Sequence, residues 1–170
     1  MRALGNILTT NDHEIVERAL FEGALDKLTT VLYSPNANLI KEVCWALSNI
    51  CAGPSHHIAQ LIESTAFDRV FFLSKSYNID HRKEALWVIC NSITGGDSII
   101  KEKVLVYNNG EVIDILITGM KLYEARLIRN ILEALEELFK LDKINGWVNK
   151  PTSVANTFNS KGGLDSLEEL

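Results

Sequence analysis

The stretch EVCWALSNICAG, residues 42–53, decides the fold because a second stretch, EALWVICNSITG at residues 84–95, repeats it. Glu, Trp, Asn and Gly recur at one constant shift, and identities of such unlike chemistry rarely coincide by chance. The matched pairs are Glu42 and Glu84, Trp45 and Trp87, Asn49 and Asn91, and Gly53 and Gly95. The chain therefore contains an internal repeat, which has to be recognised before any other feature is interpreted.

The repeat continues beyond these two stretches, although its polar residues change. One period earlier, Asn6 stands at the Asn position and Arg2 at the Trp position. One period later, Arg126, Arg129 and Glu133 stand where Glu, Trp and Asn would be. A period of about 40 to 47 residues is typical of the armadillo and HEAT classes of helical repeat.

Apolar residues at helical spacing predict three helices in each repeat. Gly23 separates the first two, and a capping Asn after Ser34 and Pro35 begins the longer third helix, which ends before Gly53 and Pro54. The predicted helices span residues 13–22, 24–33, 38–51, 55–63, 66–75, 80–93, 97–108, 111–121 and 124–141. The sequence thus predicts an all-α armadillo solenoid of about four repeats, of which the terminal ones are incomplete.

The repeat boundaries follow from this spacing. The predicted units are a partial repeat at 1–12, full repeats at 13–53, 54–96 and 97–142, a loop at 143–162, and the start of a further repeat at 163–170. The loop is predicted from a segment rich in Asn, Ser, Thr and Gly that contains Pro151. Because solenoids need a polar cap at each end, two open ends predict a fragment of a longer array.

Composition excludes several classes of protein. With 46% hydrophobic and 23% charged residues the chain is predicted to be globular and not disordered. A formal net charge of −5 argues against nucleic acid as a partner and favours basic ones. The sequence shows no apolar run long enough for a membrane span and no signal peptide at its first residues. Cys44, Cys51 and Cys90 lie among apolar residues and are predicted to be reduced core thiols, as in a cytosolic or nuclear protein.

The third helices carry the candidate chemistry. Trp45 and Asn49 are four residues apart and Glu42 precedes Trp45 by three, so all three project from one stripe of a helix. Stacked repeats would align such stripes into a ladder, in which Asn amides clamp a peptide backbone in extended conformation. Lys or Arg stems would lie between the indoles, with their charges near the ring faces and the carboxylates of Glu42 and Glu84. The ladder predicts a site for basic peptides.

The runs RALGNILT at 2–9, KEVCWALSNICAG at 41–53 and RKEALWVICNSITGG at 82–96 resemble importin-α, the nuclear-import adaptor, in order and in register. The similarity extends to about residue 141 and resumes at 162–165. It implies a right-handed superhelix like the C-terminal half of the family's array, with a site like its minor one for nuclear localisation signals. Arg2 replaces Trp as in the family's corresponding repeat. The peptide-binding residues that the resemblance implies are Trp45, Asn49, Trp87 and Asn91 as clamps, Glu42 and Glu84 as acidic partners, and Asn6 as the end of the array.

The resemblance also implies partners and location. Cargo proteins would be bound through their basic signal peptides, in the cytoplasm and the nucleus. Importin-β would be recruited only through a basic N-terminal arm that this sequence lacks. The family's last repeats contact its export receptor, and Glu133, Glu136 and Glu137 are candidates for that surface.

Two other classes of function stay open. A general armadillo scaffold would ignore basic signal peptides, and an enzyme would need an active site that we cannot assemble from this sequence. His56 and His57 beside Cys51 lack the further ligands of a zinc motif, and Gly95 to Ser98 match no phosphate-binding pattern. Trp147 lies outside the ladder and is interpreted as a packing or surface residue. We expect no catalytic residues, no cofactor and no metal.

Overall fold

The structure, a computed structural model, describes residues 2–8, 10 and 12–170, without the side chains of Arg2 and Leu4. The prediction made for the Arg2 side chain therefore lies outside what is described. All regular structure in the described range is helical. The helices are α1 Arg2–Leu8, α2 His13–Phe21, α3 Ala24–Leu32, α4 Ala37–Ile50, α5 Ser55–Ile62, α6 Thr65–Leu73, α7 Ile79–Gly95, α8 Ser98–Gly110, α9 Val112–Met120, α10 Ala125–Ile144, α11 Val154–Ser160 and α12 Gly163–Glu168.

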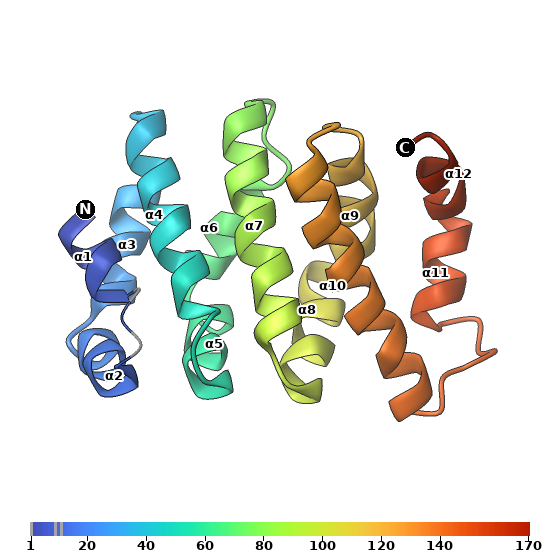
Figure 1. Ribbon diagram of the computed structural model, residues 1–170, viewed down its shortest axis with the longest axis horizontal. Helices are drawn as coiled ribbons and strands as arrows, with labels where there is room; N and C mark the ends of the chain where they lie inside the picture. The colour runs from blue at the N-terminus through green and yellow to red at the C-terminus, as the bar shows by residue number, and fades with distance from the viewer. Residues whose placement is uncertain (1, 9, 11) are drawn as a thin grey trace.

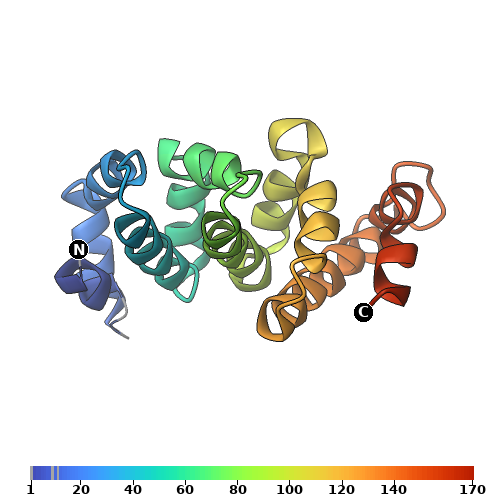
Figure 2. The same cartoon turned by 90° about the horizontal axis from the view of Figure 1, so that it is seen from above.

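The helices form a solenoid in which each repeat packs only on its neighbours. The third helices α4, α7 and α10 lie side by side and form the most extensive helix–helix packing in the array (Figure 1). At the N-terminal end, α1 packs on α4. Seen from above, the second helices α3, α6 and α9 line the opposite side of the array (Figure 2). This arrangement confirms the predicted all-α armadillo solenoid.

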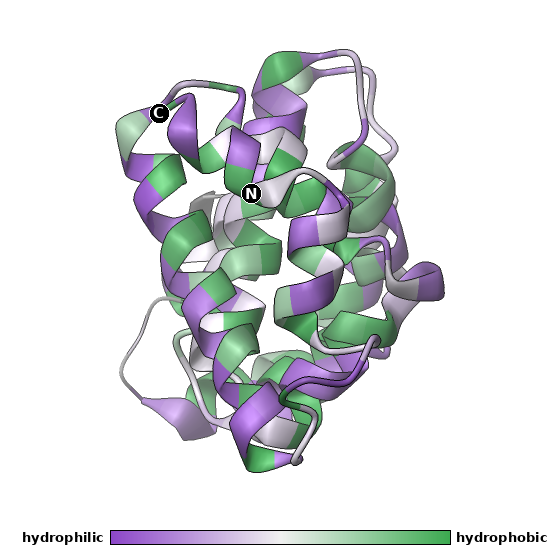
Figure 3. Cartoon of the chain, turned by 90° about the vertical axis from the view of Figure 1, so that its right-hand side faces the viewer, coloured by the Kyte–Doolittle hydropathy of each residue, from purple (hydrophilic) through white to green (hydrophobic). Residues whose placement is uncertain are grey.

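A continuous apolar core runs through the stack because each helix is amphipathic (Figure 3). Leu47 of α4, Phe67 of α6 and Leu86 of α7 are among its fully buried side chains. Cys44, Cys51 and Cys90 are free and buried in the same core. Burial raises the pKa of the Cys44 thiol to about 12, so it stays protonated and behaves as a small apolar side chain.

Two of the third helices begin at a side-chain cap, whereas Glu124 at the start of α10 makes no such bond. Asn36 Oδ1 accepts a hydrogen bond from the Asn38 backbone N at 3.0 Å, and Asn78 Oδ1 accepts one from the His81 backbone N at 3.1 Å. The predicted capping Asn after Ser34 and Pro35 is thus Asn36, and α4 begins at Ala37, one residue before the predicted start of the helix. The two caps are separated by one repeat period, so the capping residue is itself part of the repeat.

The second half of the predicted loop at 143–162 is wrong, since α11 forms there. Asp142, the buried carboxylate near the end of α10, accepts hydrogen bonds from the backbone N of Val154 at 2.8 Å and of Ala155 at 3.0 Å. Val154 and Phe158, four residues apart, are buried by the same face of α11. Asp142, which precedes the predicted loop, thus stabilises a helix of polar composition. Helices α11 and α12 pack on α9, as the first two helices of a further repeat would.

None of the described helices is both long enough and apolar enough to cross a membrane.

Candidate peptide-binding groove

The first step of the ladder is a hollow of about 470 Å³ between α1, α4 and α7. Its lining residues are Asn6, Lys41, Glu42, Trp45 and Glu84. Trp45 is 38% exposed, so its indole is open to a partner, while both glutamates are half-buried. The structure therefore brings together four of the seven predicted site residues and adds Lys41.

Gly5 of α1 explains where the Trp45 indole lies. A methyl group added at Gly5 would collide with the ring carbons of Trp45. The missing side chain on α1 lets the indole pack against the neighbouring helix and leaves its other side toward the hollow. The position of Trp45 thus depends on a small residue in the preceding repeat.

Lysines and glutamates link successive third helices across the ladder. Lys41 Nζ lies 3.4 Å from Glu84 Oε1, and Lys83 Nζ lies 2.8 Å from Glu124 Oε2. In each case a lysine that precedes a ladder glutamate reaches an acid of the next repeat. Burial raises the pKa of Glu84 above its usual range, and the nearby Lys41 partly opposes that shift. Part of the negative charge in the first hollow is therefore engaged within the chain.

The second step differs from the first. Trp87 packs partly into the core and lines a hollow of about 320 Å³ whose other side is basic. That side is formed by α10, through Arg126, Arg129, Asn130 and Glu133. A cationic side chain would meet two arginines here, at the step where Arg126 and Arg129 take the places of Glu and Trp in the repeat.

Asn91 is already hydrogen-bonded in this structure. Asn130 lies on α10 and is largely buried, and its Nδ2 donates a hydrogen bond to Asn91 Oδ1 at 3.1 Å. This partner was missed in the sequence because Asn130 falls three positions short of the repeat shift from Asn91. Asn91 Oδ1 is therefore engaged by Asn130, and the NH₂ group at Asn91 Nδ2 is the part of this side chain that can donate to a peptide.

Asn49 lies apart from the Trp45 hollow. It lines a smaller hollow of about 160 Å³ with residues of α2 and α5. Its Nδ2 is buried and has no hydrogen-bond partner among the described residues. The amide donor that the ladder requires of Asn49 therefore lies on this smaller hollow and is not open to the groove beside Trp45.

Comparison with known proteins agrees with this geometry. The armadillo/beta-catenin-like repeat family model matches residues 22–52. A 96-residue segment is 34% identical to importin subunit alpha-2 of Oryza sativa subsp. japonica, covering 54% of this chain and 18% of that protein. The chain is therefore similar to armadillo repeats and, over this segment, to an importin subunit alpha. The chain thus spans about a fifth of the length of this relative.

Solved structures share the armadillo fold over 99% of the chain. One is a designed armadillo repeat protein in complex with the peptide (KR)4, with a TM-score of 0.78, 24% identity and 64% of its own length covered. Another is a computationally designed armadillo repeat protein for modular peptide recognition, with a TM-score of 0.77, 22% identity and 65% of its length covered. At such identity these likenesses show the fold alone.

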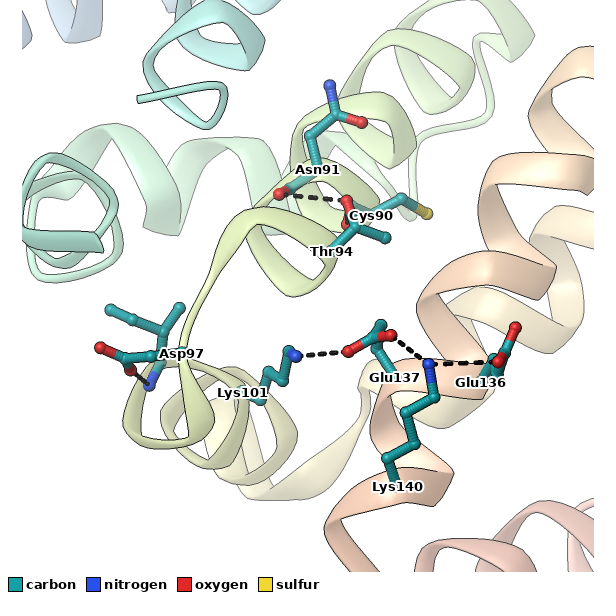
Figure 4. A network of polar contacts seen from close by, with 9 residues as sticks. Cys90, Asn91, Thr94, Asp97, Lys101, Glu136, Glu137 and Lys140 are labelled. Carbon is teal, nitrogen blue, oxygen red and sulfur yellow. Dashed lines mark hydrogen bonds and ion pairs between the residues drawn. The ribbon is translucent and has the colours of Figure 1, made fainter. Parts of the chain in front are cut away.

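The acidic residues on α10 of this armadillo array are partly neutralised within the chain. Lys101 Nζ of α8 lies 2.5 Å from Glu137 Oε2 (Figure 4). Lys140 Nζ lies 2.6 Å from Glu137 Oε1 and 3.1 Å from Glu136 Oε1. Of the three glutamates predicted for an export receptor, Glu133 lines the hollow beside Trp87. The Asn91 side chain points away from this network in the same view (Figure 4).

Proposed function

We propose that the armadillo array binds Lys/Arg-rich nuclear localisation signal peptides in extended conformation, as a nuclear-import adaptor. The observation that carries the proposal is the first hollow, in which the exposed Trp45 indole and the carboxylates of Glu42 and Glu84 line the same space. An indole beside two acids suits a side chain with an apolar stem and a cationic end. The net charge of −5 favours the approach of such a peptide.

The peptide backbone would be held by the ladder amides. Asn49 has an unpaired Nδ2 that is buried, so its side chain would have to turn toward the groove, and Asn91 keeps its own NH₂ group while its oxygen accepts from Asn130. Asn6 lines the hollow at the α1 end. Asn side chains that pair with the backbone carbonyls of a peptide do not distinguish one peptide sequence from another. Specificity for basic peptides would therefore come from contacts between the peptide's cationic side chains and Trp45.

The relatives support this proposal by what their names state. The partial match is to an importin subunit alpha, and the designed armadillo protein of similar fold was solved with a peptide of alternating lysine and arginine. By this likeness the chain would carry cargo between cytoplasm and nucleus. We assign recruitment of importin-β to a basic N-terminal arm of the kind that the family has, and export to a receptor that contacts the last repeats.

The test is a titration of a fluorescent Lys/Arg-rich signal peptide into the purified chain at physiological salt. A peptide of the same composition with its basic residues dispersed serves as the control for charge alone. Preferential, salt-sensitive binding of the clustered peptide supports an import adaptor. Equal or absent binding by a folded sample contradicts it.

The basic wall beside Trp87 favours a second candidate, a scaffold for another protein. Arg126 and Arg129 would accept a carboxylate of a partner where the import adaptor needs to bind a cation. The same titration with a peptide that combines acidic and aromatic residues distinguishes the two candidates. A scaffold binds that peptide and ignores the signal peptide.

Replacing Lys41 with glutamine is expected to tighten binding of the basic peptide. The change frees Glu84 from its ion pair and removes a positive charge from the hollow. Because exposed ion pairs contribute about 0.2–1 kcal/mol, we expect the Kd to fall about two- to fivefold. Fluorescence titration measures it, and Lys27→Gln on α3 controls for net charge. An unchanged or larger Kd would contradict a role for Glu84 in the groove.

As the pH is lowered, peptide affinity is expected to begin to decline at a higher pH than it would if Glu84 had the usual pKa of a glutamate. The raised pKa of Glu84 means that this carboxyl takes up a proton at a pH above its usual range, which removes an attraction for the cation. Affinity is therefore fully present well above that pKa and declines as the pH falls toward it. Titrations at successive pH values measure this decline, and Glu84→Gln should flatten it. A decline of the same size in Glu84→Gln would assign it to another group.

A further inference from the structure

Three potential metal ligands from two repeats meet at the N-terminal end of the array. Glu17 of α2 faces His56 and His57 of α5, and one ligand atom from each lies within 4.8 Å of the others. The rings of His56 and His57 are 4.3 Å apart between centroids. Sequence spacing did not point to this cluster, because Glu17 belongs to the preceding repeat and lies 39 positions before His56.

His57 is the unusual member of the cluster. Its side chain is fully buried, yet neither ring nitrogen has a hydrogen-bond partner among the described residues. Buried polar groups are nearly always paired, so an imidazole with two unpaired nitrogens indicates a missing ligand. His57 also lines the 160 Å³ hollow that contains Thr10, His13 and the unpaired Nδ2 of Asn49.

We propose that His56, His57 and Glu17 bind one divalent transition-metal ion of the Zn²⁺ type. Two imidazoles and a carboxylate are ligands that Zn²⁺ accepts, whereas Ca²⁺ and Mg²⁺ require mainly oxygen. Bonds of about 2.0–2.2 Å require the three groups to converge slightly. Glu17 and His56 are exposed, so these two side chains can close on the buried His57.

His13 is the nearest further protein ligand. It precedes Glu17 by one helical turn on α2, and its ring centroid lies 6.3 Å from that of His57. A water molecule or His13 would complete a four-coordinate site. Cys51 is excluded, because its buried thiol lies 3.6 Å from the carbonyl oxygen of Leu47 and 3.3 Å from the hydroxyl of Ser92.

A metal at this place would join α2 and α5 of adjacent repeats. Neighbouring repeats in a solenoid are held by their interface alone, so a bridging ion adds a link at the end of the array. Binding to the folded state but not to the unfolded chain raises stability in proportion to the logarithm of metal concentration. The inference is independent of peptide binding.

The experiment is a calorimetric titration of ZnCl₂ into the full chain, with Co²⁺ absorption as a report of ligand geometry. We expect one Zn²⁺ per chain and a rise in the thermal unfolding midpoint. Glu17→Gln and His56→Gln, both surface changes that leave the core intact, are each expected to weaken affinity at least about tenfold, the lower range for disturbing a metal site.

Two matched variants control for nonspecific binding. Glu14→Gln removes a carboxylate from the same helix, and His81→Gln removes a histidine from α7. Both should keep the affinity of the unaltered chain within about twofold. The proposal is overturned if no Zn²⁺ binds, or if the control variants lose as much affinity as Glu17→Gln and His56→Gln.

Discussion

Replacing both Trp45 and Trp87 with alanine is expected to weaken binding of a Lys/Arg-rich peptide about 30- to 700-fold. Each indole offers a face for a cation and a wall for its stem, and such contacts contribute about 1–2 kcal/mol when partly desolvated. Since about 1.4 kcal/mol corresponds to a tenfold change in Kd, two such losses give the expected factor. Fluorescence titration at physiological salt measures it.

The two indoles differ in what else their removal does. Trp45 is 38% exposed and packs on Gly5 of α1, so Trp45→Ala should lower the unfolding midpoint, but less than removal of a core side chain would. Trp87 packs against the core, so Trp87→Ala should also destabilise the protein, and Trp87→Phe separates packing from binding. Trp147→Ala removes an indole outside the ladder and should leave peptide affinity intact. Binding by the double variant as tight as that of Trp147→Ala would rule out the ladder.

Replacing Asp142 with alanine is expected to lower the free energy of unfolding by about 3–6 kcal/mol and to detach α11 and α12 from the array. The carboxylate accepts from the backbone N of Val154 and Ala155, and the Val154 bond is buried. Hydrogen bonds to a charged group contribute about 1.5–3 kcal/mol each, and a buried donor left without a partner adds a desolvation cost. Amide hydrogen exchange at Val154 and Ala155 should show the loss of protection.

A graded variant tests the cause. Asp142→Asn keeps one acceptor oxygen without the charge and should fall between the unaltered chain and Asp142→Ala. Helices α4 to α7 should keep their protection in both variants, because neighbour contacts dominate in a solenoid. Unchanged exchange at Val154 in Asp142→Ala would show that packing of Phe158 alone holds α11.

The loop that turned out to contain α11 shows where sequence patterns are weakest. The segment is short and polar, and its helical signal is a single pair of apolar residues, Val154 and Phe158, four positions apart. Its cap comes partly from Ser153 and partly from Asp142, which lies 12 residues earlier than Val154. Patterns within a short window do not include that distant carboxylate.

The sequence by itself determined the repeat, the three helices of each unit and the stripe that carries Trp45 and Trp87. These features depend on helical periodicity, which is local. The tertiary structure decided which side chains meet between repeats. It packs the Trp45 indole on Gly5, pairs Lys41 with Glu84, and joins Asn130 to Asn91 by a hydrogen bond. It also brings Glu17 close to His56 and His57. Those contacts depend on the rotation and offset between stacked repeats, and the spacing of residues along one chain does not fix either quantity.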